Sequence, residues 1–263
     1  MLNQVQHDVI GKTMNIFEER TYRSQFNTER FSGFEVKHLE TDLWIGIDPA
    51  SYKEEMQEVA LAKMKTLRQT FDDYIEKEPF FKKSLKPFQP SDFAPEEAKE
   101  MAVAAEKAGI GPMSAVAGLF AREIGEELLN NFSINELLVE NGGDIFVSLI
   151  NELVLSVFAG ESILSERIGL VIPADNEKMG ICTSAGTVGL SLSYGKADAV
   201  VVVCNDILMA DALATAFGNK VKSPDHVEKV IKQAENFQEI QSLLIICEDK
   251  IGIKGDNEIK ILK

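Results

Sequence analysis

The chain has 263 residues, of which 45% are hydrophobic and 26% are charged. These proportions are close to globular averages and exclude a disordered, collagenous or disulfide-scaffold protein as a whole. The 42 acidic and 27 basic side chains give a net charge of −15. Because such a field repels phosphate backbones, nucleic acid is not an expected partner, although a pocket of backbone N–H groups can still bind a small anion.

The cysteine pattern and the apolar segments indicate the cellular compartment in which the protein is expected. Cys182, Cys204 and Cys247 are widely spaced and form no C-x-x-C pair, which suits a reducing environment without structural zinc or disulfides. Residues 1–20 contain charges and no continuous apolar segment of the signal-peptide type. The longest apolar run, Ala199–Cys204, is too short to span a bilayer. The sequence therefore predicts a cytoplasmic protein with no membrane association.

The first half of the chain predicts an arm, a hairpin and three helices. Residues 1–32 are polar and irregular and are expected to form an N-terminal arm. Alternating apolar residues within 33–48 predict a hairpin or two adjacent strands. The segment 80–93 contains Pro87 and Pro90 and is predicted to be a connecting loop. Apolar spacing of three and four residues predicts helices over 52–77, 95–108 and 113–130.

The second half is richer in short β-like runs. Together with the early helices, this order predicts an α+β domain over 33–263 made of two intimately joined halves, and not an alternating doubly wound sheet. Helices are expected over 207–220 and 224–237, and strands over 137–139, 145–149, 153–158, 168–172, 199–204, 243–247, 251–254 and 259–262.

A paired-glycine segment, Glu140–Ile145, is the first candidate for chemistry. Gly142 and Gly143 can adopt positive φ and expose N–H groups to a ligand, while Asp144 is placed where the next strand begins. The same residues also fit an ordinary hairpin turn, because Asn-Gly is a strong hairpin signal. Both interpretations stay open on residue types alone.

A hydroxyl- and glycine-rich segment, Cys182–Gly189, is the second candidate. Its amides and hydroxyls can bind phosphate oxygens without a positive side chain, although a glycine-rich edge or turn explains them equally well. The third candidate is Asp211 with Thr215, four residues apart and so on one face of a predicted helix. A carboxylate and a hydroxyl suit Mg²⁺, whereas a structural alternative has Asp211 near the helix start and Thr215 packed.

These three segments, in this order, resemble the ApbE-like superfamily, whose characterised members are FAD:protein FMN transferases or FAD pyrophosphatases. The resemblance is closer to an uncharacterised branch of that superfamily, and it runs from about Tyr22 to Cys247. The segments that carry it are Glu40–Leu43, Gly111–Met113 with Ala115–Gly118, Glu140–Ile145, Thr183–Gly189, Ser191–Ala199 and Asp211–Ala216.

The resemblance implies an ApbE-like, duplicated T-fold-like α+β fold, with antiparallel sheets, helices packed on one side and FAD between two related halves. It implies that Asp144 orients the ring system or acts as a catalytic base. It also implies a Mg²⁺ pair at Asp211 and Thr215, completed by a backbone carbonyl near Ala117. The implied ligand-binding residues are Asn141, Gly142, Gly143, Asp144, Thr183, Ser184, Gly186, Thr187, Gly189 and Ser191.

This chain departs from the transferases at two positions. They carry a Lys-Gly pair at the head of the third helix, where this chain has Ala117-Gly118. They also carry a histidine-containing segment after the Thr-Ser loop, where Ser191–Lys196 contains no histidine. The groups that position and cleave the nucleotide in the transferases are therefore not all present.

Three functions remain open from the sequence. The first is a flavin-nucleotide-binding protein with Mg²⁺-dependent FMN transferase or FAD pyrophosphatase activity. The second is a non-catalytic carrier of a small metabolite. The third is an enzyme acting on another small anionic substrate, with a contribution from Cys182 or Lys196. In each case the expected partner is a nucleotide or another anionic metabolite, and a homodimer is left open.

Overall fold

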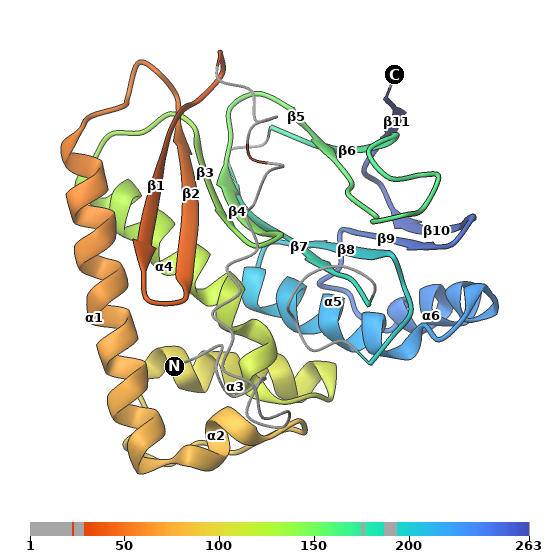
Figure 1. The fold of residues 1–263 in the computed structure, drawn as a ribbon, viewed down its shortest axis with the longest axis horizontal. Helices are drawn as coiled ribbons and strands as arrows, with labels where there is room; N and C mark the ends of the chain where they lie inside the picture. Colours follow the sequence, from red (N-terminus) through yellow and green to blue (C-terminus); the bar gives the residue numbers. More distant parts are fainter. Residues whose placement is uncertain (1–22, 24–28, 175–176, 187–193, 263) are drawn as a thin grey trace.

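The computed structural model describes Arg23 and residues 29–174, 177–186 and 194–262. Figure 1 shows a large twisted sheet with helices along one face and a smaller sheet beside the other. The strands of the large sheet are antiparallel to their neighbours and follow the order β1-β2-β3-β4-β7-β8-β9-β10. Their bounds are β1 Ser32–His38, β2 Thr41–Ile47, β3 Leu137–Asn141, β4 Asp144–Ser148, β7 Lys178–Ser184, β8 Ala199–Cys204, β9 Ser242–Cys247 and β10 Lys250–Gly255.

The large sheet repeats one topology. In the first half, β1 and β2 are followed by helices and then by β3 and β4. In the second half, β7 and β8 are followed by helices and then by β9 and β10. The halves join through β4 and β7, where Asp144 lies opposite Cys182. The α+β, ApbE-like fold class predicted from the sequence is confirmed.

The helices cover one face of this sheet. In the first half the long α1 lies against α4, and in the second half α5 packs on β7 and β8. The bounds are α1 Glu55–Lys77, α2 Pro79–Lys83, α3 Glu96–Ala108, the 3₁₀ turn η3 Pro112–Ala115, α4 Val116–Asn131, α5 Ile207–Lys220, η4 Pro224–His226 and α6 Val227–Ala234. Among the described residues, none of these helices combines the length and apolar character that a bilayer crossing requires.

Both faces of the large sheet are buried at its centre, which explains why the central strand β8 is apolar at every position. On the helix side, Val139, Val202 and Ile245 belong to the core that contains the helix residues. On the other side, Ile181 and Val201 pack in a second core with the small sheet. That sheet has the order β11-β6-β5, with β5 Leu153–Ser156, β6 Ile168–Ile172 and β11 Ile259–Ile261.

The predicted loop over 80–93 is wrong at its start, because Pro79–Lys83 forms α2. Proline is well tolerated at the first helical position, where its missing N–H is not needed. The short helix is anchored by Phe81, whose buried ring meets Tyr74 of α1 edge-on at 5.0 Å between centroids. A tertiary contact of this kind has no local sequence pattern.

Candidate functional site

The Asn141–Asp144 segment joins β3 to β4 as a hairpin turn. Gly142 and Gly143 have φ values of 68° and 102°, and such positive φ values in a turn favour glycine. The turn also lies against the end of β7, because Thr183 N donates to Gly143 O at 3.1 Å. The hairpin and the candidate site are therefore the same structure.

The end of β7 brings the second candidate segment to this turn. Thr183 and Ser184 are partly exposed, and a Cβ added to Gly218 of α5 would come within 3.1 Å of Ser184 Oγ. Gly186 is exposed, and its N–H donates to Ala197 O at 2.8 Å. The remaining residues proposed for this segment, Thr187, Gly189 and Ser191, lie outside the described residues.

Beneath the turn, a buried thiol lies between two carboxylates. Cys182 is opposite Asp144 in the sheet register, and its Sγ is 3.7 Å from Ile207 O at the start of α5. Burial, together with the nearby charges of Asp144 and Asp211, raises the pKa of the Cys182 thiol well above its usual value. Since the thiolate is the reactive form, this environment disfavours Cys182 as a nucleophile.

The Asp211 carboxylate lies at the start of α4. Its Oδ2 accepts a hydrogen bond from Gly118 N at 2.8 Å, and its side chain is almost fully buried. Burial raises the pKa of Asp211 to about 7, although the backbone N–H groups of Gly118 and Ala117 act in the opposite direction. The carbonyl of Ala117 accepts a hydrogen bond from Asn141 Nδ2 at 3.0 Å. One peptide unit therefore links the turn to Asp211.

The donor set at this point suits a partly hydrated Mg²⁺ ion. Thr215 is the partly exposed residue in a segment of α5 that is otherwise buried from Ile207 to Gly218. With Asp211 it offers a carboxylate and a hydroxyl, and Mg²⁺ commonly adds waters and substrate phosphates to such a pair. Within the described part of the chain, no group of three or more His, Cys, Asp and Glu side chains is arranged to hold a metal.

Ala117 O is a poor third ligand for such an ion. It belongs to the same trans peptide unit as Gly118 N, so it points away from the carboxylate oxygen that Gly118 N contacts. It is also already bonded to Asn141. Of the groups considered for a metal ion, the side chains of Asp211 and Thr215 therefore remain as candidate ligands.

One contact of the candidate site was not predicted from the sequence. Glu140 is only 1% exposed, and its Oε1 accepts a hydrogen bond from Gly143 N at 3.0 Å. Its other oxygen accepts from Arg23 Nε at 2.8 Å. A charged residue directly after the apolar run Leu137–Val139 is the signal that could have identified Glu140, since a buried carboxylate needs a partner.

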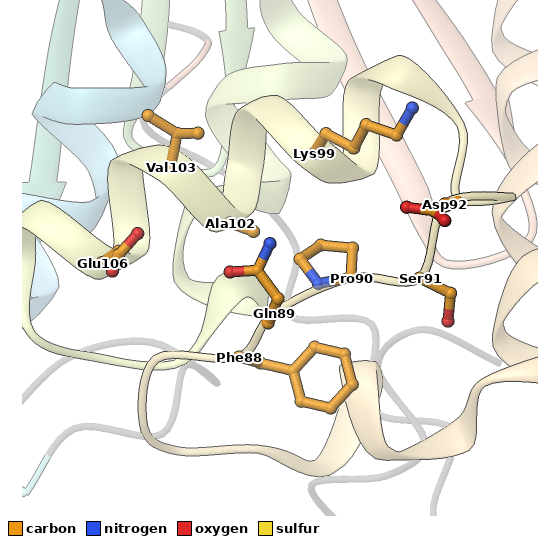
Figure 2. A pocket seen from close by; sticks show the side chains of 9 residues that line it. All are labelled: Phe88, Gln89, Pro90, Ser91, Asp92, Lys99, Ala102, Val103 and Glu106. Atoms are coloured by element: carbon orange, nitrogen blue, oxygen red, sulfur yellow. The ribbon is translucent and has the colours of Figure 1, made fainter.

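A separate pocket lies away from these residues. It encloses about 280 Å³ between the segment 88–92 and one side of α3. Figure 2 shows Gln89 and Pro90 facing Ala102 across it, with Lys99 on one side of Ala102 along α3 and Glu106 on the other. No residue predicted for the candidate site lines this pocket, so the two places are distinct.

The fold is of the ApbE-like class, because solved structures of ApbE proteins have the same architecture. The apo flavinyl transferase ApbE of Pseudomonas stutzeri matches with a TM-score of 0.55 at 12% identity, over 85% of this chain and 93% of that one. The ApbE protein of Thermotoga maritima matches with a TM-score of 0.53 at 15% identity, over 86% and 97%.

The family follows from the sequence comparisons. A family model described as AbpE bacteria matches residues 23–244, and the chain belongs to this family. A UPF0280 protein of Methanocaldococcus jannaschii is 34% identical over 221 residues, which are 82% of this chain and 87% of the relative. A UPF0280 protein of Methanosarcina barkeri is 38% identical over 201 residues, which are 75% and 78%. The ApbE-like branch predicted from the sequence is confirmed.

Proposed function

We propose that this chain binds a flavin nucleotide, FAD in the first instance, beside the Asn141–Asp144 turn, the end of β7 and α5. The observation that carries the proposal is the contact of all three candidate segments around one point. Gly143 bonds Thr183, Asn141 bonds the first turn of α4, and that turn bonds Asp211. The names of the structural neighbours, which are flavin transferases, support a flavin as ligand.

The residues have distinct proposed roles. The backbone of Gly142 and Gly143 can approach the ligand closely, and the partly exposed Thr183 and Ser184 offer hydroxyl groups. Asp144, at 9% exposure, is the candidate base or ring-orienting group. Asp211 and Thr215 would hold Mg²⁺, which when bound neutralises pyrophosphate oxygens.

The proposed activity is transfer of FMN from FAD to a protein hydroxyl, or hydrolysis of FAD to FMN and AMP. Both reactions release AMP, so AMP reports either one. A carrier without turnover is the second candidate. Ala117-Gly118 stands where the transferases have Lys-Gly, and Ser191–Lys196 contains no histidine, so two groups of the transferases are absent.

The test is a titration of purified, ligand-free protein with FAD, with and without Mg²⁺. Flavin fluorescence measures binding, and released AMP measures turnover. Asp144→Ala and Asp211→Ala are expected to abolish AMP release without unfolding the protein. Asp206→Ala is the matched control, because Asp206 directly precedes the same helix and its carboxylate caps Leu208 N.

The outcomes separate the alternatives. Saturable binding with AMP release supports the enzyme, and binding without AMP, even with added acceptor proteins, supports the carrier. No binding up to millimolar FAD would refute a flavin ligand. Normal turnover in both the Asp144 and Asp211 variants would refute the assigned site.

A further inference from the structure

Arg23 forms a buried ion pair with the strand that leads into the glycine turn. Its side chain is 6% exposed, and its Nη2 lies 2.7 Å from Glu140 Oε2, in addition to the Nε contact. Arg23 also donates to Asp42, through Oδ1 at 2.6 Å and the backbone carbonyl at 3.1 Å. The guanidinium therefore fixes Glu140 from two nitrogens while it is itself held by β2.

Glu140 passes this restraint directly to the turn. The two carboxylate oxygens of Glu140 have different partners: Oε2 accepts from Arg23, and Oε1 accepts the N–H of Gly143 at 3.0 Å. Gly143 has a positive φ, and its carbonyl accepts a hydrogen bond from Thr183 N. A shift of Glu140 would thus move a residue that joins two of the three candidate segments.

A second arginine in the same region shows what a purely structural clamp looks like. Arg30 donates to both oxygens of Glu136, and Glu136 also accepts from Ile150 N and Asn151 N. Glu136 directly precedes β3, so it lies four residues from Glu140, or about 13 Å along the strand. Its contacts are at the far end of β3 and do not include the Gly142–Gly143 turn.

We infer that Arg23 is a positioning residue for the Gly142–Gly143 turn and acts on ligand binding through Glu140. The inference rests on the proposed function for its ligand, but the effect on the turn is independent of any ligand. Loss of Arg23 removes the guanidinium that holds Glu140 Oε2 in place, so the buried carboxylate is expected to rearrange. This rearrangement weakens the hydrogen bond from Gly143 N to Glu140 Oε1.

The test compares Arg23→Gln with Arg30→Gln as the matched control. Hydrogen exchange of the Gly143 amide, followed by NMR in ligand-free protein, measures the turn itself. Arg23→Gln is expected to speed this exchange about tenfold, while Arg30→Gln leaves it unchanged although it also lowers the unfolding temperature. The affinity for FAD in the presence of Mg²⁺ is expected to fall about tenfold in Arg23→Gln only.

The double variant Arg23→Gln with Glu140→Gln adds a coupling readout. The second substitution keeps an amide oxygen for Gly143 N and removes the buried charge, so the double variant should exchange no faster at Gly143 than Arg23→Gln alone. If Arg23→Gln does not fold, Arg23→Lys is compared with Arg30→Lys, because lysine loses the planar fork through which two nitrogens of Arg23 contact Glu140.

The failures of the two proposals are distinguishable. Unchanged Gly143 exchange in a less stable Arg23 variant would reduce Arg23 to a structural clamp and overturn the inference. Equal acceleration in the Arg30 variant would do the same. If wild-type protein does not bind FAD, the flavin proposal fails, and the amide exchange still decides whether Arg23 sets the turn.

Discussion

Asp211 should make the free energy of unfolding depend on pH in an unusual direction. Its pKa rises from 3.8 to about 7 on folding, because the side chain is buried. Between about pH 4 and pH 7 the folded protein therefore holds a proton that the unfolded chain has lost. Stability is then highest below the unfolded pKa and decreases as the pH rises, by about 1.4 kcal/mol per unit.

The stabilisation that the protonated Asp211 contributes to the free energy of unfolding is on the order of 4 kcal/mol, and its loss is complete at about pH 7. Carboxylates with lowered pKa values, such as Glu136 and Asp48, act with the opposite sign: their stabilisation is lost as the pH falls through their folded pKa values, below about pH 4.5. Asp211→Asn isolates the Asp211 contribution, since asparagine keeps an oxygen for Gly118 N and does not titrate.

The assay is urea denaturation of both proteins, free of divalent ions, at half-unit steps from pH 4.5 to 8. The stability of wild type relative to Asp211→Asn is expected to fall steadily up to about pH 7 and then to level off. Mg²⁺ should reverse the trend, since it binds the ionised carboxylate, and its apparent affinity at pH 5.5 should be about 30-fold weaker than well above pH 7. A constant difference between the two proteins would refute the assigned titration, and Mg²⁺ stabilisation of Asp211→Asn would refute the metal site.

Glycine substitutions test the packing around the site. Gly143→Ala places a side chain at φ 102° and should lower the free energy of unfolding by about 1–2 kcal/mol and weaken FAD binding. Gly109→Ala, at φ 74° with open space around it, should lower it by about 1 kcal/mol with no effect on FAD binding. Urea midpoints measure the stability of both variants, and FAD titrations measure their binding. Gly180→Ala would bring a Cβ to 2.3 Å from Ile207 Cα, so α5 must shift and about 3 kcal/mol should be lost; an unchanged urea midpoint would contradict this packing.

The parts of the fold that sequence patterns predicted are those with a local cause. Alternation of apolar and polar residues gave the hairpin of β1 and β2, whose register pairs Val36 with Leu43. The paired glycines gave the turn between β3 and β4. The spacing of apolar residues gave α1, although the helix begins at Glu55 and not at Tyr52. Each of these elements is specified by residues within one or two turns of chain.

The elements that were missed depend on distant contacts. The strand β7, Lys178–Ser184, includes the start of the second candidate segment and was not predicted; within it, Gly180 lets Ile207 of α5 approach the backbone. The three strands of the small sheet were predicted as separate segments, but their pairing was not: β11 pairs with β6 across about ninety residues of chain, as in the pairing of Ile259 with Leu170. No local pattern encodes such pairings, since loop closure and burial decide them.

The same distinction applies to the candidate site. Asn141, Asp144, Thr183 and Asp211 were each predicted from their own segments, and the structure brings these segments together. The contact of Arg23 with Glu140 spans 117 residues and was not predicted. The local signal for this contact is the Glu140 carboxylate within a buried strand, which indicates that Glu140 has a partner but not where that partner lies.

The position of Asp211 also bears on how an acidic protein could bind an anionic nucleotide. The first N–H groups of a helix are a natural phosphate site, but at α4 the Asp211 carboxylate already accepts the N–H of Gly118. A phosphate that approached this point would meet the carboxylate and be repelled by it when it is ionised. A cation between the two reverses the sign of that interaction. Binding of FAD at this site should therefore require Mg²⁺ in wild type, and Asp211→Asn should reduce this requirement while it removes the ion's main ligand.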